Sequence, residues 1–141
     1  MDILAYDYIL EGLKQFNTKI DQNYGNVIYS ELPTFGKNKT ISYPITIFEE
    51  NTNTANAQYN SCHDKVSSLS YVVDIYAKSK GNITKKTIAR KIAKEIDTYL
   101  TEYVGLVRVG FMSDGLLGDG SLHRIVMTYS GNLHENRRNF I

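Results

Sequence analysis

The fold is decided by residues 69–101, LSYVVDIYAKSKGNITKKTIARKIAKEIDTYLT. Its first part alternates apolar and polar residues, which is typical of a strand with one buried face. The residues of that face are Leu69, Tyr71, Val73, Ile75 and Ala77. After a short polar turn, a helix is expected from about residue 82 or 84 to residue 100. Its apolar arc comprises Ile88, Ala89, Ile92, Ala93, Ile96, Tyr99 and Leu100. The stretch therefore predicts a strand with an amphipathic helix packed against it.

The opposite side of this helix is basic. It carries Lys86, Arg90, Lys91 and Lys94, and positions 78–94 contain no Asp or Glu. Such a patch is compatible with a solvated helix surface, with a protein contact, or with a surface close to DNA. Aromatic residues that would stack on bases are not interleaved with these cations, which weakens the nucleic-acid reading.

Composition indicates an ordinary globular domain. The chain has 141 residues, a net charge of +1 and a single cysteine, Cys62, so an intrachain disulfide is excluded. We expect one domain over residues 1–131, followed by a basic C-terminal tail over residues 132–141. The N-terminal residues lack the basic and apolar regions of a signal peptide, and no apolar run is long enough to span a membrane.

Further elements follow from the same periodicities. A helix with one apolar face is expected over residues 2–16, capped by Asp2, and strands are expected over residues 27–29, 42–49, 106–112 and 123–131. Two amphipathic helices and four to five mainly antiparallel strands pack most simply with both helices on one face of the sheet. The predicted fold class is therefore α+β.

Two polar stretches connect these elements. Residues 51–68 (NTNTANAQYNSCHDKVSS) are predicted to form a long flexible loop or the tip of a hairpin. Residues 113–121 (SDGLLGDGS) are predicted to form a glycine-rich connection. In the strand before it, Val107, Val109 and Phe111 are expected to point to one side.

No pattern of catalytic or ligand-binding residues stands out. Cys62, His63 and Asp64 are adjacent, and the second ligand pair that a zinc site needs is missing. The glycines of residues 115–120 are followed by a strand, without the lysine of a phosphate-binding loop or the helix of a dinucleotide site. His123 and Arg124 are expected at half-exposed sheet positions. The sequence thus predicts no catalytic residue, no metal and no cofactor.

The amino-acid sequences of the predicted strands resemble those of a known family. Residues 43–49 (YPITIFE), residues 71–79 (YVVDIYAKS) with the Lys-rich helix, and residues 123–130 (HRIVMTYS) are similar to the small tail terminator, or tail-completion, proteins of long-tailed bacteriophages. Related neck and head–tail joining proteins share much of the pattern. The resemblance covers residues 2–130 and rests on the order of the elements and on the amino-acid sequences of the strands.

This resemblance implies a virion structural protein without enzymatic activity. Members of the family form a homo-oligomeric ring, commonly a hexamer, on the last ring of the tail tube protein. The ring stops tube growth and offers a docking surface for the head connector at the head–tail junction, and genome DNA passes through its lumen. Such a protein is made in the host cytoplasm and has no membrane partner.

Two alternatives remain beside the tail terminator. One is a neck or head-completion connector of similar fold, and the other is a nucleic-acid-binding module that uses the basic face of the helix over residues 82–100. Candidate DNA-facing or interface residues are Lys86, Arg90, Lys91 and Lys94. Candidate partner-contacting residues are Asn53, Tyr59, His63, Arg137, Arg138 and Phe140.

Overall fold

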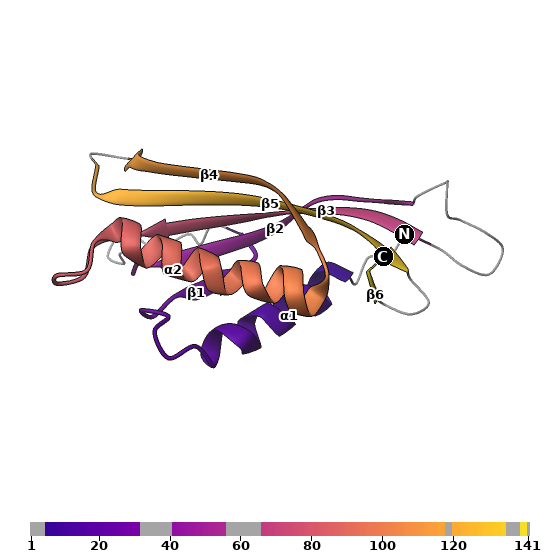
Figure 1. The fold of residues 1–141 in the computed structure, drawn as a ribbon, viewed down its shortest axis with the longest axis horizontal. Coiled ribbons are helices and arrows are strands. Elements are labelled where there is room, and N and C mark those ends of the chain that lie inside the picture. Colours follow the sequence, from indigo (N-terminus) through magenta and orange to yellow (C-terminus); the bar gives the residue numbers. More distant parts are fainter. Residues whose placement is uncertain (1–4, 32–40, 56–65, 118–119, 135–138, 141) are drawn as a thin grey trace.

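The computed structural model describes residues 5–31, 41–55, 66–117, 120–134 and 139–140. Two α-helices, a π-helical turn and six strands follow one another along these segments (Figure 1). In chain order they are α1 (Ala5–Thr18), β1 (Val27–Tyr29), β2 (Ile45–Ala55), β3 (Val66–Ala77), α2 (Lys85–Thr98), the π-helical turn (Tyr99–Val104), β4 (Val107–Leu117), β5 (Leu122–His134) and β6 (Asn139–Phe140).

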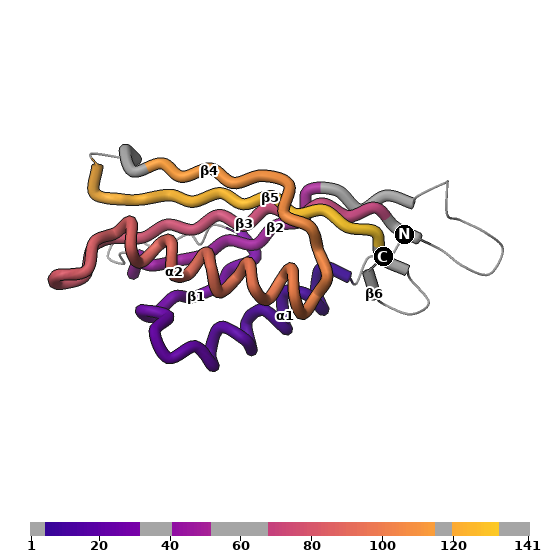
Figure 2. The backbone as a smooth tube through the Cα atoms, viewed as in Figure 1, coloured from indigo at the N-terminus to yellow at the C-terminus, as the bar shows by residue number. Residues whose placement is uncertain are grey.

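The strands form one sheet in the order β1-β2-β3-β5-β4, and β6 pairs with β5. Only the β1–β2 pair is parallel; the other described pairs are antiparallel. Both helices lie on the same face of the sheet, as the backbone trace shows (Figure 2). The predicted α+β class is confirmed.

The core lies between this sheet face and the helices. The five predicted inward residues of β3, from Leu69 to Ala77, are buried. Helix α2 contributes the predicted arc of Ile88, Ala89, Ile92, Ala93 and Ile96, with Leu100 from the π-helical turn. The apolar residues of the strand, which repeat every two positions, and those of the helix, which repeat every 3.6 positions, thus form one apolar layer.

Helix α1 closes the β1–β2 side of this layer. The Tyr6 ring stacks on Phe48 of β2 with ring centroids 5.3 Å apart, and its hydroxyl donates to the Phe48 carbonyl. Burial, aided by Glu49 and Asp7, raises the pKa of Tyr6 to about 12. Tyr6 is therefore a neutral packing residue at physiological pH.

A buried amide cluster ties the end of α1 to the sheet. The Asn17 side-chain amide donates to the Asn26 carbonyl at 2.8 Å, and the Thr46 hydroxyl donates to Asn26 Oδ1 at 2.9 Å. Asn26 Nδ2 donates in turn to Asn17 Oδ1 at 3.3 Å. These buried polar groups satisfy one another, so the polar stretch between α1 and β1 is anchored in the fold.

Helical structure continues beyond the predicted end at residue 100. The π-helical turn carries it to Val104, and Gly105, with φ of 93°, ends it in the left-handed conformation that glycine adopts without strain. The extra turn brings Tyr99 and Tyr103 against Phe16 of α1, with ring centroids 5.1 and 5.9 Å apart. It therefore joins the two helices.

Part of the predicted loop over residues 51–68 is strand. Strand β2 begins after Pro44, which cannot donate to the ladder, and continues to Ala55; β3 begins at Val66. The two strands stay paired out to Ala55↔Ser67. Ladder hydrogen bonds are made by the backbone, so a polar Asn- and Thr-rich sequence extends the hairpin. Residues 56–65 lie outside the described part of the chain.

The predicted glycine-rich connection and the predicted C-terminal tail also contain strand residues. Strand β4 includes residues 113–117, so the glycine-rich connection does not start at Ser113. Strand β5 runs past Gly131 to His134, and β6 pairs back through Leu133↔Phe140. Part of the predicted tail over residues 132–141 is therefore sheet. The predicted cap Asp2 lies outside the described residues.

Gly12 provides a test of helix packing. We expect Gly12→Ala to lower the free energy of unfolding by about 1–3 kcal/mol, because an added Cβ would lie 2.1 Å from the hydroxyl oxygen of Tyr99. In an open helix interior the same change stabilises by about 1 kcal/mol. Chemical denaturation of the two proteins measures the difference.

The matched control repeats this substitution in a Tyr99→Phe background. That background lacks the clashing oxygen, and the next ring atom, Cζ, lies 3.3 Å from the added Cβ. Most of the penalty should then disappear. An equal loss of stability in both backgrounds would show that the Gly12–Tyr99 approach is not its cause.

Candidate functional site

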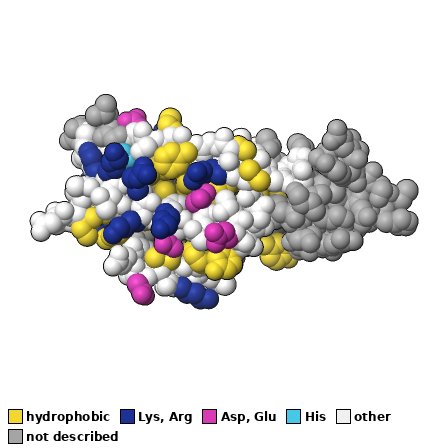
Figure 3. Space-filling model, viewed as in Figure 1, with side chains coloured by type: hydrophobic (Ala, Val, Ile, Leu, Met, Phe, Trp, Pro, Cys, Tyr) yellow, Lys and Arg dark blue, Asp and Glu magenta, His cyan; other side chains and the backbone are white. Residues whose placement is uncertain are grey.

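The basic face of α2 is positioned by the start of the helix. Thr84 caps it by accepting the Thr87 N–H at 3.3 Å. Burial of the apolar arc then directs Lys86, Arg90 and Lys94, which are spaced four residues apart, into solvent along one stripe. Figure 3 shows Lys and Arg side chains gathered over this part of the molecule. The first helical turn contains no acidic residue, so the positive end of the helix dipole adds to the charge.

Lys91 belongs to a different environment from the other predicted cations. Its Nζ lies 5.9 Å from the ring centroid of Tyr24 and donates to the Tyr24 hydroxyl at 3.2 Å. Lys80 donates to the Tyr24 carbonyl. These contacts fix Tyr24, whose φ is 56°, in the α1–β1 connection. Lys91 is thus also a structural residue.

A hollow of about 170 Å³ lies between α2 and β4, and we call it the α2–β4 hollow. Its lining residues are Arg90, Ala93, Lys94, Asp97, Arg108, Phe111 and Met127. Cross-strand register explains why β4 contributes to it: Arg108 lies opposite Tyr129 and Phe111 opposite Met127, both on the helix-facing side of β5.

Arg108 is held in place at this hollow. Its guanidinium carbon lies 5.5 Å from the Phe111 ring centroid, and its Nη1 lies 3.4 Å from Asp97 Oδ2. The Tyr129 hydroxyl donates to Asp97 Oδ1 at 2.6 Å. Burial and this bond raise the pKa of Tyr129, so the phenol stays a donor. Asp97 is thereby occupied, and within the described chain Arg90 and Lys94 have no carboxylate partner.

Strand β4 also exposes a row of large apolar side chains, which we call the β4 edge strip. Exposed fractions are 62% for Val107, 62% for Val109, 46% for Phe111 and 51% for Met112. The prediction that Val107, Val109 and Phe111 share one side is wrong, because the register shifts between Arg108 and Gly110. This bulge at Val109 moves Phe111 to the opposite face from Val107.

The sheet face without helices carries an ion pair. Arg124 donates to both carboxylate oxygens of Asp74 at 2.8 and 2.7 Å, and this bonding raises the pKa of Arg124. Tyr76 donates to Asp74 at 3.3 Å, and its ring centroid lies 5.5 Å from the Arg124 guanidinium. Asp74 is thus a partner in a structural cluster.

His123 is buried, with an exposed fraction of 5%, so the expected half-exposed position is wrong. It shares the helix-facing side of β5, and its Nε2 lies 2.7 Å from Ser113 Oγ. Burial, followed by Lys86 and Lys85, lowers the pKa of His123. A Ser–His pair can activate a nucleophile. Here neither side chain lines the α2–β4 hollow, so the pair is not directed into that space.

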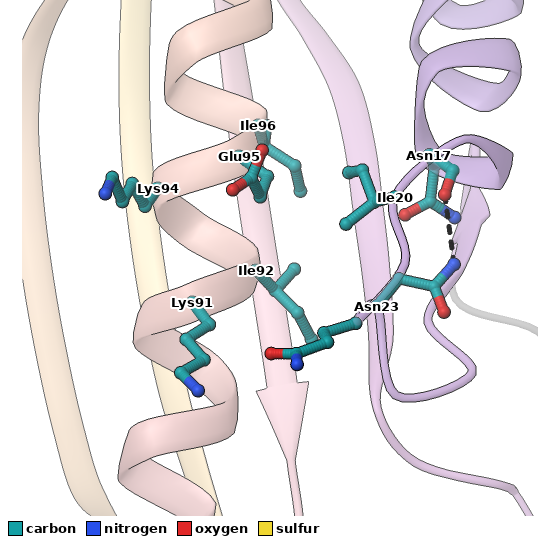
Figure 4. Close-up of a pocket in the computed structure, with 9 residues that line it drawn as sticks. Asn17, Ile20, Asn23, Lys91, Ile92, Lys94, Glu95 and Ile96 are labelled. Atoms are coloured by element: carbon teal, nitrogen blue, oxygen red, sulfur yellow. Dashed lines mark hydrogen bonds between the residues drawn. The ribbon is translucent and has the colours of Figure 1, made fainter.

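A second hollow, of about 230 Å³, separates α2 from the α1–β1 connection (Figure 4). Ile20, Ile92 and Ile96 supply apolar surface, and the Asn23 amide donates to the Asn17 carbonyl at 3.0 Å. The Asn17 and Asn23 amides are thus already engaged within the protein. We interpret this hollow as a crevice of helix packing.

Several other predicted site residues add little to these surfaces. Asn53 pairs with Leu69 in the β2–β3 ladder, and Phe140 belongs to β6. Those outside the described residues are Tyr59, His63, Arg137 and Arg138, together with the Cys62–Asp64 cluster. Across the described ranges, no group of three His, Cys, Asp or Glu residues is placed to hold a metal ion. No helix in those ranges has the length and apolar character of a membrane span.

The candidate site therefore consists of the basic stripe, the α2–β4 hollow and the β4 edge strip. The basic stripe is predictable from the sequence, whereas the hollow and the edge strip were not predicted. The sequence does contain an indication of the edge strip, because residues 106–112 place apolar side chains at both odd and even positions. Neither a scan of protein-family models nor a search of curated proteins finds a match for the chain.

The lowered pKa of His123 predicts a pH dependence of stability. The pKa of a histidine in an unfolded chain is about 6.5, whereas burial lowers the pKa of His123 in the folded protein. Below that pH the unfolded state binds more protons, so the free energy of unfolding should fall as pH drops from about 7 through about 6.5 until folded His123 also titrates. Denaturation at a series of pH values measures this.

His123→Gln is the matched variant, because an amide can keep a hydrogen bond to Ser113 without titrating. The difference in stability between the wild type and this variant should change over the same pH window and flatten above it. A constant difference from pH 5 to pH 8 would show that His123 does not cause the effect.

Proposed function

We propose that this protein is a virion structural subunit, a tail terminator that assembles as a homo-oligomeric ring at the head-proximal end of a phage tail tube. In this role it acts by contact, without catalysis. Its partners are copies of itself, the tail tube protein and the head connector, and genome DNA passes through the ring.

The observation that carries the proposal is the β4 edge strip. Four of the eight large hydrophobic side chains that are exposed in the described chain lie on this one strand. Strand β4 is also at the edge of the sheet, next to β5 alone. Large exposed apolar side chains on both faces of an edge strand favour association, and monomeric proteins usually avoid clusters of them. An assembling subunit accounts for such a surface.

The layered fold supports the same role. Both helices occupy one face of the sheet, which leaves the other face and the β4 edge available to partners (Figure 1). A small domain that presents different surfaces to its neighbours can form a closed ring when its self-contact is head-to-tail. The resemblance of its strands to tail terminators selects the head–tail junction as the location, and a neck connector of similar fold is the nearest alternative.

Self-assembly is the first test. We expect the purified protein to form a discrete oligomer, with a hexamer as the leading stoichiometry, in mass photometry and negative-stain images. We also expect it to cap isolated tail tubes. Val107→Ser combined with Val109→Ser should shift assembly to concentrations at least about tenfold higher, because both side chains are exposed in the subunit.

Ile83→Ser is the matched control, since Ile83 is an exposed apolar residue outside β4. It should assemble like the wild type. A wild-type protein that stays monomeric at high concentration, alone and with tail tubes, would contradict the proposal.

Nucleic-acid binding is the second candidate function, favoured by the stripe of Lys86, Arg90 and Lys94. It predicts an affinity for duplex DNA that falls steeply as salt rises. Replacing the three cations by Gln should then reduce both the affinity and the salt slope, whereas Lys14→Gln with Lys19→Gln should not. Absence of binding at low salt in a fluorescence anisotropy titration would remove this candidate.

A further inference from the structure

We propose that the α2–β4 hollow of one subunit receives the outer face of α1 from the next subunit. The docking face of α1 consists of Asp7, Tyr8 and Glu11. This inference rests on the proposed self-assembly and names the two surfaces that meet.

The hollow has an excess of positive charge over an apolar floor. Arg90, Lys94 and Arg108 surround it, while Phe111, which is 46% exposed, supplies apolar surface beside the buried Ala93 and Met127. Its one acidic residue, Asp97, already interacts with Arg108 and Tyr129. Figure 3 shows hydrophobic side chains between blue cations in this region. The surface therefore fits an apolar or aromatic group that is flanked by carboxylates.

The outer face of α1 has that character. Its inward side is fixed by the buried residues Ile9, Leu10 and Leu13. The opposite side exposes Asp7 and Glu11, four residues apart, with Tyr8 beside them and 57% exposed. Lys14 is exposed one turn further along this side, so two carboxylates stand against one cation. A tyrosine offers a rigid apolar ring with a polar tip, which suits insertion at an interface.

The two surfaces lie toward opposite ends of the strand order. Helix α1 contacts β1, which is one edge strand, whereas β4 is the other edge strand. Figure 1 shows α1 at the bottom of the view and β4 as the uppermost strand of the sheet. A contact between α1 of one copy and the hollow of another is therefore head-to-tail. Contacts of this type continue from subunit to subunit and close into a ring when the rotation permits.

Direct strand addition at β4 is the less favourable way to cover the edge. The bulge at Val109 interrupts the regular ladder geometry, and Arg108 places a cation on the same segment. Both features are devices that disfavour edge-to-edge pairing. Side-chain docking into the adjacent hollow covers Phe111 of the edge strip without requiring a continuous ladder.

Charge reversal tests the contact. Arg90→Glu and Glu11→Lys should each shift ring assembly to concentrations at least about tenfold higher in mass photometry, because each places like charges across the interface. The double variant should recover assembly, since the pair is restored with opposite sign. An equimolar mixture of the two single variants should recover it too, because every contact in an alternating ring then joins opposite charges.

Lys19→Glu and Asp21→Lys are the matched controls, as both residues are exposed outside the two surfaces. They should assemble like the wild type. Circular dichroism with thermal melting should show every variant folded. Rings that tolerate both single reversals, or a double variant as defective as the single ones, would overturn the proposed contact. So would a variant pattern in which Arg90→Glu changes only DNA affinity.

Capping of isolated tail tubes provides a separate measurement. If charge-swapped and wild-type rings form as expected and neither caps tubes, the contact stands and the tail-terminator function fails. If wild-type rings cap tubes and the charge reversals have no effect, the function stands and this contact is overturned.

Discussion

The pairing of β3 with β5 is the constraint on which the other elements depend. Every residue of β3 from Val66 to Ala77 has a partner in β5. Because side chains alternate between the two faces, this register sets Val73 against Met127 and Ile75 against Ile125 on the side that α2 covers. A slip by one residue would turn these side chains away from α2 and remove the core.

Covering a single sheet face has a consequence for the rest of the molecule. The opposite face must be stabilised by its own contacts, and the bidentate Asp74–Arg124 pair with Tyr76 provides one such cluster. The β4 edge is not covered in this way within the described chain, because its large apolar side chains remain exposed. The chain thus combines a complete core with an edge strand whose large apolar side chains stay exposed.

The sequence predicted features that depend on local periodicity. It identified the inward face of β3, the buried arc of α2 and the start of that helix near Thr84. It did not reveal the bulge at Val109 or the burial of His123, because both depend on cross-strand register and on helix cover. The basic stripe was likewise predictable, whereas the hollow beside it required the positions of Arg108 and Phe111.

The length of the hairpin strands implies two levels of cooperativity. Strands β2, β3 and β5 extend past the end of the helices (Figure 1). Near the helices, backbone amides are protected by a packed core; in the extension, pairs such as Ala55↔Ser67 and Val66↔His134 are joined by the backbone ladder. Amide hydrogens of the extension should therefore exchange through local openings, independently of global unfolding. The sheet can adapt at one end while its other end remains rigid.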